Sequence, residues 1–239
     1  MSSNRTKAFA QPLSNPAKRF LEWKSNDKTF GYYDKSIAES MKGKSADEIK
    51  EAANVKIQLP FKFLVLDQLH TVSGWNDATS SGIYSNEVKF ISKQVMTVKP
   101  FKGNEIAKGL YADIKEKVKN AGGHYVKSIY IMLEDGTLAN IQLKGSSVQQ
   151  WGEFTNKSLS RLPEEWVVVD KAIEGKKGSV RYTTPGFKFG GSLSDSEANQ
   201  ADLVFDELET YLKAYLIKEE SPVEVADLDP TDDDDLDFI

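Results

Sequence analysis

Three charged residues have a spacing that could do hydrolytic chemistry. Asp77 is followed by the triplet Glu87-Val88-Lys89. In metal-dependent nucleases, two carboxylates at such a spacing hold Mg²⁺ and the lysine polarises the attacking water. The match is only three residues long in a chain of which 28% is charged, and Asp77 lies among small polar residues. A Mg-dependent nuclease with Asp77, Glu87 and Lys89 is therefore kept as an alternative hypothesis.

A second set of residues places aromatic rings beside cations. Any base can stack on an aromatic ring, and lysine or arginine side chains can follow the phosphates of a nucleic-acid strand. Trp75 and Tyr84 bracket a polar loop, and the other members lie on expected strands or hairpins. Many of the 25 Phe, Tyr and Trp residues must form the core, so we expect about half of the aromatic members to be buried. The predicted binding set is Trp23, Lys24, Tyr32, Tyr33, Trp75, Tyr84, Lys89, Tyr125, Lys127, Arg181, Tyr182, Phe187 and Lys188.

The C-terminal segment has a third distinctive pattern. Between Glu219 and Ile239 there are ten acids and no Lys or Arg, so residues 1–218 carry a net charge of +5 although the whole chain carries -5. A block of like charge cannot compact, and the apolar residues at its end suggest a docking peptide more than a solubilising tail. The predicted partner-binding residues are Asp232, Asp233, Asp234, Asp235, Leu236, Asp237, Phe238 and Ile239.

This tail resembles the tail of bacterial and phage-encoded single-stranded DNA-binding proteins, whose acidic C-terminal tips end in an apolar pair that contains Phe. The bacterial pattern ends in Pro-Phe, whereas this chain ends in Asp-Phe-Ile. The resemblance implies a non-enzymatic protein without cofactors that binds single-stranded DNA in replication, recombination and repair. It also implies that the tail recruits a polymerase, helicase or primase, and it gives a cytoplasmic location, in the host if the protein is phage-encoded.

Composition excludes several other classes of function. The chain has no cysteine, which rules out disulfides and thiolate metal sites, and its two histidines, His70 and His124, cannot form a His-rich site. No stretch approaches the ~20 apolar residues of a membrane helix, so no membrane partner is expected. A homo-oligomer is compatible with the sequence. A non-DNA interaction protein, such as a DNA mimic, is a further alternative, but the acids are confined to the tail.

The elements that must position these residues follow from the apolar pattern. We expect a flexible arm over residues 1–16, an ordered domain over 17–218 and a disordered acidic tail over 219–239. Turn signals at Asn26-Asp27 and Asp135-Gly136 predict hairpins. A short strand followed by a long one that starts near Phe61 is expected over 56–72, and further strands are expected over 87–98, 166–173 and 179–189. A loop is expected over 75–85. Helices are expected over 36–53 with a break at Gly43, over 106–118, over 148–154 and over 194–218, where Ser194 and Glu197 form a capping box.

Many short strands joined by hairpins favour a small barrel over a doubly wound parallel sheet. The predicted fold class is mainly β (α+β). We expect an OB-fold-like small barrel with additional strands, an internal amphipathic helix over 106–118 and a long C-terminal helix.

Overall fold

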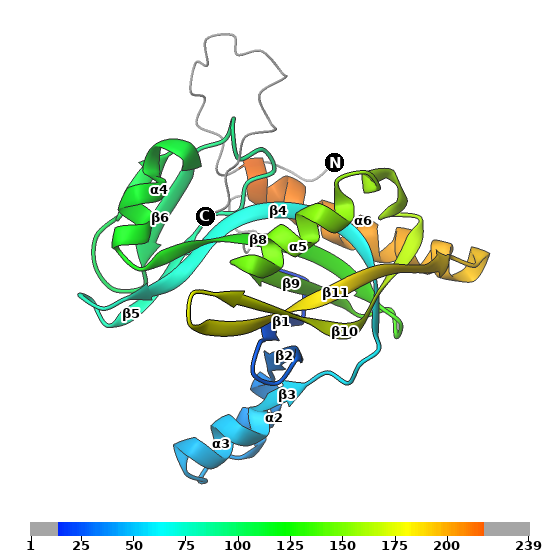
Figure 1. Cartoon of the computed structure of the whole chain (residues 1–239), viewed down its shortest axis with the longest axis horizontal. Coiled ribbons are helices and arrows are strands. Elements are labelled where there is room, and N and C mark those ends of the chain that lie inside the picture. The colour runs from blue at the N-terminus through cyan, green and yellow to red at the C-terminus, as the bar shows by residue number, and fades with distance from the viewer. Residues whose placement is uncertain (1–13, 218–239) are drawn as a thin grey trace, which may run out of the picture.

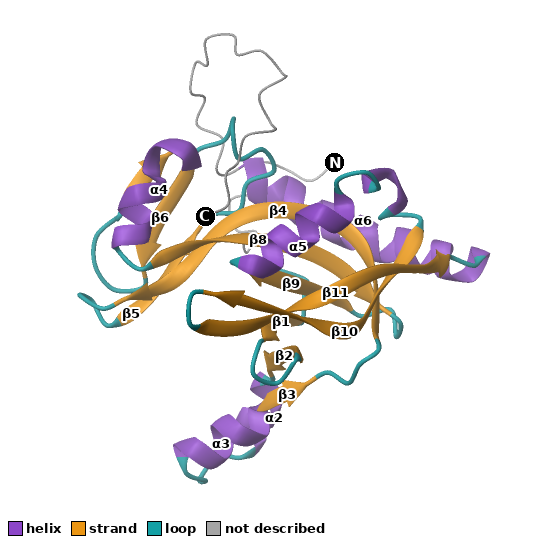
Figure 2. Ribbon diagram, in the orientation of Figure 1, coloured by secondary structure: helices purple, strands orange, loops and turns teal. Residues whose placement is uncertain are grey.

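The computed structural model describes residues 14–217, which form one sheet with helices on both of its sides (Figures 1 and 2). The fold is mixed α+β and mostly sheet, as predicted. The strands are β1 (Arg19–Lys24), β2 (Thr29–Tyr33), β3 (Asn54–Lys56), β4 (Phe61–Asn76), β5 (Ser81–Ser85), β6 (Met96–Pro100), β7 (Ala107–Gly109), β8 (Gly123–Leu133), β9 (Leu138–Lys144), β10 (Glu165–Lys177) and β11 (Val180–Ser192). The helices are α2 (Lys35–Ser40), α3 (Ala46–Ala53), α4 (Tyr111–Asn120), α5 (Ser146–Thr155) and α6 (Asp195–Ile217), with a short 3₁₀ turn at Leu159–Arg161.

The strands are ordered β3-β2-β1-β9-β8-β4-β5-β6-β7, and β10 adds a branch by pairing with the start of β4 and with β11. Every pair among these strands is antiparallel except β1 with β9. The 16-residue strand β4 organises the sheet, because it pairs with β10 at one end, β5 at the other and β8 along most of its length. A bulge between Val65 and Asp67 bends it.

The larger core lies on the face of the sheet that α5 covers, here called the α5 face. Phe63, Ile129 and Ile141 come from neighbouring strands, and Trp151 of α5 packs on them. The β10–β11 hairpin crosses in front of this face (Figure 1). Hydrogen bonds fasten it to the end of β1, where Trp23 Nε1 donates to the Thr183 carbonyl at 2.8 Å and the Thr183 amide donates to Ser25 Oγ at 2.7 Å.

The opposite face, here called the α6 face, is partly covered by α6, which lies behind the sheet in Figure 1. Val204, Leu208 and Leu212 repeat every fourth residue and therefore form one side of the helix, which packs on Leu64 and Tyr130. A third cluster lies beneath α4, where Ile114 and Val118 meet apolar residues of β4, β5 and β6. Residues 77–122, inserted between β4 and β8, therefore have a small core of their own.

Several predicted features are confirmed. The turn after Lys24 joins β1 to β2, and Gly136, with φ of 78°, follows Asp135 in the turn between β8 and β9. The helix over 36–53 is split around Gly43 into α2 and α3. At the start of α6, the Ser194 amide donates to the Glu197 carboxylate at 2.7 Å and the Glu197 amide donates to Ser194 Oγ at 3.3 Å, so the capping box forms as predicted.

Two expected strand boundaries are wrong. The strand predicted over 87–98 is reduced to β6, because side-chain amides replace ladder bonds over 86–95: Asn86 Oδ1 accepts from the Thr97 amide at 2.7 Å, and Gln94 Oε1 accepts from the Lys89 amide at 2.7 Å. The loop predicted over 75–85 shrinks to a turn at 77–80, since β4 and β5 extend into it. Asn76 Oδ1 caps that turn by accepting from the Thr79 amide at 2.9 Å.

The predicted helix over 106–118 also begins later than expected. Residues Ala107–Gly109 pair with β6 as strand β7, and Gly109 has φ of 155°, which is outside the helical region. The helix starts only at Tyr111. Within residues 14–217, no helix has the length and apolar character needed to cross a bilayer.

Candidate nucleic-acid interface

Three aromatic side chains lie together on the α6 face where β4, β5 and β6 run side by side. Trp75 of β4 is paired with Gly82 of β5, and the Phe101 amide, just after β6, donates to the Gly82 carbonyl at 2.9 Å. Tyr84 is paired with Lys99. Because paired residues share a face and neighbours along a strand alternate, these rings point away from the core beneath α4, which receives Val72, Ile83 and Val98. We call Trp75, Tyr84 and Phe101 the aromatic platform.

Two of the three platform rings are largely exposed to solvent. The exposed fraction is 56% for Trp75 and 74% for Phe101. The Phe101 and Tyr84 rings lie 4.7 Å apart, inclined by 33°. Phe101 lies over Gly82, where a Cβ atom would come within 3.1 Å of its ring, so the glycine lets the ring lie against the strand. Exposed rings on a sheet supported from behind by a core are suited to stacking with planar ligands.

Two lysines and a histidine lie beside the platform. Lys99 shares the face with Tyr84, Lys108 is the partner of Thr97 on the same face, and His124 is the partner of Ser73. Within residues 14–217, neither Lys99 nor Lys108 takes part in an ion pair. Residues 77–122 hold eight lysines against five acids, although three of these lysines are on α4, which covers the opposite face. Lys99 and Lys108 therefore favour an anionic ligand beside the platform.

The α6 face continues from the platform over β8 and β9 to β1. There Glu22 accepts from Lys24 at 3.0 Å and from Lys144 at 2.7 Å, so one carboxylate orients two lysines. Burial raises the pKa of Glu22, but the hydrogen bonds and charges of Lys144 and Lys24 outweigh it and lower the pKa overall. The carboxylate stays ionised, and the three groups together carry one positive charge.

Of the predicted binding residues, Lys24, Tyr33, Trp75 and Tyr84 lie on the α6 face. Trp23, Tyr125 and Phe187 pack against the core of the α5 face, and Phe187 meets the Trp151 ring edge-on at 4.8 Å. Tyr125 Oη also lies 2.6 Å from His70 Nδ1. These three rings are partly buried and therefore less accessible to a base than Trp75. The expectation that about half of the aromatic members are buried is wrong in this form, because six of the eight are partly buried and two, Tyr33 and Trp75, are exposed.

The remaining predicted residues are dispersed. Arg181 is exposed near the end of the β10–β11 hairpin, and the Tyr182 ring covers Gly175. Lys188 pairs with Asp170. Tyr32 lies beneath the guanidinium of Arg19 at 5.4 Å.

Lys127 is half-buried on the α5 face, beside His70. Burial, together with the charge of Lys89, lowers its pKa to about 8, while Asp67 opposes the shift.

Sequence reasoning misses five residues of this surface, which are Phe101, Lys99, Lys108, His124 and Lys144. The alternation of Lys99, Pro100 and Phe101 is a signal for a strand with one solvent face, but the predicted strand stops at residue 98.

The nuclease motif is rearranged in the fold. Asp77 lies exposed in the turn between β4 and β5, whereas Glu87 is turned into the protein, where the hydroxyls of Ser128 and Tyr130 donate to its carboxylate. Lys89 pairs instead with Asp67. Within residues 14–217, no three His, Asp or Glu side chains are grouped so that they could hold a metal ion.

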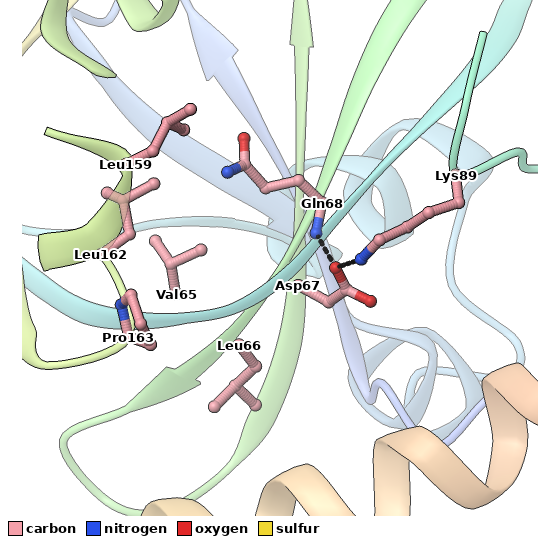
Figure 3. Close-up of a pocket in the computed structure, with 8 residues that line it drawn as sticks. All are labelled: Val65, Leu66, Asp67, Gln68, Lys89, Leu159, Leu162 and Pro163. Atoms are coloured by element: carbon pink, nitrogen blue, oxygen red, sulfur yellow. Dashed lines mark hydrogen bonds and ion pairs between the residues drawn. The ribbon is translucent and has the colours of Figure 1, made fainter. Parts of the chain in front are cut away.

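A pocket of about 270 Å³ adjoins the Asp67–Lys89 pair (Figure 3). Asp67 Oδ1 accepts from the Gln68 amide at 2.6 Å, and Leu159 and Leu162 line the opposite wall. Pockets for small molecules usually measure about 300–1,000 Å³ and enclose most of the ligand. This hollow is slightly below that range, and a second one of about 310 Å³ beside Arg19 and Tyr32 is at its lower limit, so we take the exposed rings of the platform as the better candidate.

The partly buried Glu87 predicts a particular pH dependence of stability. Burial raises its pKa, Asp67 raises it further, and the hydrogen bonds from Ser128 and Tyr130 oppose the shift without cancelling it. Its contribution to stability is therefore full below the unfolded-state pKa of about 4.3 and is lost as pH rises through the raised folded value. The free energy of unfolding, measured with urea between pH 4.5 and 8, should fall with pH in the wild type. In Glu87→Gln most of this fall should be absent, because the amide does not ionise. The same decline in wild type and variant would contradict this account.

In comparisons with known proteins, no protein-family model matches the chain, and no curated protein or solved structure matches it either.

Proposed function

We propose that the chain binds single-stranded DNA without sequence preference, with the aromatic platform stacking on bases and the surrounding lysines contacting phosphates. The observation that carries the proposal is the exposure of Trp75 and Phe101 on one face with Tyr84, Lys99 and Lys108. Each stacked base contributes about 1–3 kcal/mol whatever its identity, because every base has a π face. Duplex DNA hides those faces, so the platform favours single strands.

We also propose an OB-fold-like barrel as the scaffold, for which the topology gives support. Strands β4, β8, β9, β10 and β11 occur in the order of a five-stranded barrel, with β4 pairing both β8 and β10 and with α5 between the third and fourth strands. Strands β9 and β11 are not paired directly. Strand β1 lies between them, because it runs parallel to β9 and the turn after it is hydrogen-bonded to β11. OB-folds bind oligonucleotides on the second and third strands and on the loop between the first two. In this chain that loop is 77–122, which supplies Tyr84 and Phe101.

The proposed role is in DNA replication or recombination, in the manner of phage-encoded single-stranded DNA-binding proteins. Its acidic tail would recruit a polymerase, helicase or primase. The tail residues Asp232–Ile239 lie outside the described residues, so this part of the proposal rests on their sequence alone. A net charge of -10 over 219–239, tethered to a body of +5, would also compete with DNA for the same lysines.

Titration with oligo-dT tests the central claim. Of the four tryptophans, Trp151 and Trp166 are buried and Trp23 is bonded to Thr183, so quenching on binding is expected to report mainly Trp75. Affinity for dT16 should exceed that for a duplex of equal length by about ten-fold or more and should fall as salt rises. Trp75→Phe should lose the quenching and keep most of the affinity, measured by anisotropy of a labelled oligonucleotide. Equal affinity for both DNA forms would refute the proposal.

A further inference from the structure

A second pair of exposed rings lies on the α6 face, on strands β1 and β2 and not on the strands of the platform. Phe20 on β1 is 43% exposed and Tyr33 on β2 is 50% exposed. The strand register pairs Glu22 with Gly31, and continuing it by two residues places Phe20 opposite Tyr33. Neighbouring Leu21 is fully buried in the core of the α5 face, so Phe20 projects from the other side. The two rings are therefore neighbours on the same face as the platform.

The surface between the two groups of rings is polar and cationic. Gln142 on β9 is paired with Glu22, and Lys24 and Lys144 flank that carboxylate. Exposed Lys18 lies two residues before Phe20. Asn140, Ser128 and Val126 are fully buried on this face, so the exposed route between the two groups of rings runs by Gln142, Lys144 and His124. A nucleic-acid strand on that route would meet lysines between two aromatic stations.

We propose that Phe20 and Tyr33 form a second base-stacking station, so that one DNA strand crosses the α6 face from β2 to β6. This inference rests on the proposed function and adds to it a second site and a path. The path covers six strand-to-strand steps of about 4.8 Å, or about 29 Å across the sheet. The register places Phe20 level with Asp67, eight residues before Trp75, which adds a displacement of about 26 Å along the strands and gives a separation of about 39 Å. At about 3.4 Å per stacked nucleotide this corresponds to about twelve nucleotides. That length falls within the ~4–16 nucleotides that one OB-fold covers.

Binding to short and long oligonucleotides distinguishes one station from two. A dT4 strand is too short to bridge the stations, whereas dT16 can occupy both. In Phe20→Ala/Tyr33→Ala, affinity for dT16 is expected to fall by about ten-fold or more, because stacking at one end of the path is lost. Affinity for dT4, followed by quenching of Trp75 at the intact platform, should stay within about two-fold of wild type.

Phe205→Ala is the matched control, since this ring is 38% exposed on the acidic helix α6, where phosphates are repelled. It should change neither affinity. Equal losses on dT4 and dT16 would show damage transmitted to the platform and would overturn the second station. Unchanged binding of both strands, with Trp75→Ala still weakening them, would overturn the station and leave the proposed function standing. If the wild-type protein binds neither strand, the proposed function fails and the station with it.

Discussion

Removing both exposed rings of the platform, in Trp75→Ala/Phe101→Ala, is expected to weaken binding of dT16 by at least about 2 kcal/mol, or about 30-fold. Each ring offers a stacking surface that any base can use, and the lysines around them contribute charge without holding the bases in place. The DNA should therefore remain bound weakly and with a salt dependence close to that of wild type, because no cation has been removed. Anisotropy of a labelled oligonucleotide measures the affinity without relying on Trp75.

The control for this experiment is Phe90→Ala. Phe90 is 58% exposed, but it lies in the irregular segment 86–95 and not among the paired strands. Its removal should leave the affinity unchanged. Since Trp75 and Phe101 are exposed, the double variant should unfold within about 0.5 kcal/mol of wild type. Wild-type affinity in a folded double variant would mean that the platform does not stack with DNA.

Local chemistry determines the parts of the fold that can be predicted. The Asp135-Gly136 turn and the capping box of Ser194 and Glu197 depend on residues close together in the chain. Their local sequence is therefore sufficient to predict them. Segment 86–95 is different. Its alternating apolar residues satisfy a strand pattern, but Asn86 and Gln94 bond to backbone groups across the segment and replace the ladder. The apolar alternation of a segment does not show whether a polar side chain will face solvent or form a hydrogen bond with a nearby backbone group.

The proposed binding face is harder to predict for a related reason. Phe20 and Trp23 are three residues apart on one strand, and strand alternation sends them to opposite faces. The sequence does not say which face is buried. Trp23 belongs to the predicted binding set and instead donates to Thr183, 160 positions away. Which face of β1 is buried depends on its pairing with β9 and on the cores on the two sides of the sheet. The sequence predicts that Trp75 and Tyr84 bracket a loop, whereas they lie on the adjacent strands β4 and β5.

Deleting Asp232–Ile239 is expected to tighten binding to single-stranded DNA, most strongly at low salt. The deletion removes five aspartates and leaves a more positive protein whose lysines have lost an internal competitor. The gain should shrink as salt rises, because the screening length falls from about 30 Å at 0.01 M to about 8 Å at 0.15 M. Titrations of dT16 at several salt concentrations measure the change. An unchanged affinity at the lowest salt would mean that the tail does not compete with DNA.

Phe238→Ala separates partner recruitment from this charge effect, because it keeps every aspartate and removes only one aromatic ring. Its affinity for dT16 should equal that of the intact protein at every salt concentration. Binding to a cognate polymerase, helicase or primase should fall by about 2 kcal/mol or more, the usual cost of losing an aromatic anchor. Asp237→Asn is the complementary control: it keeps the ring, removes one charge, and should weaken partner binding much less while slightly tightening DNA binding. If Phe238→Ala and Asp237→Asn weaken partner binding equally, the tail acts through charge alone and the docking role of the ring is refuted.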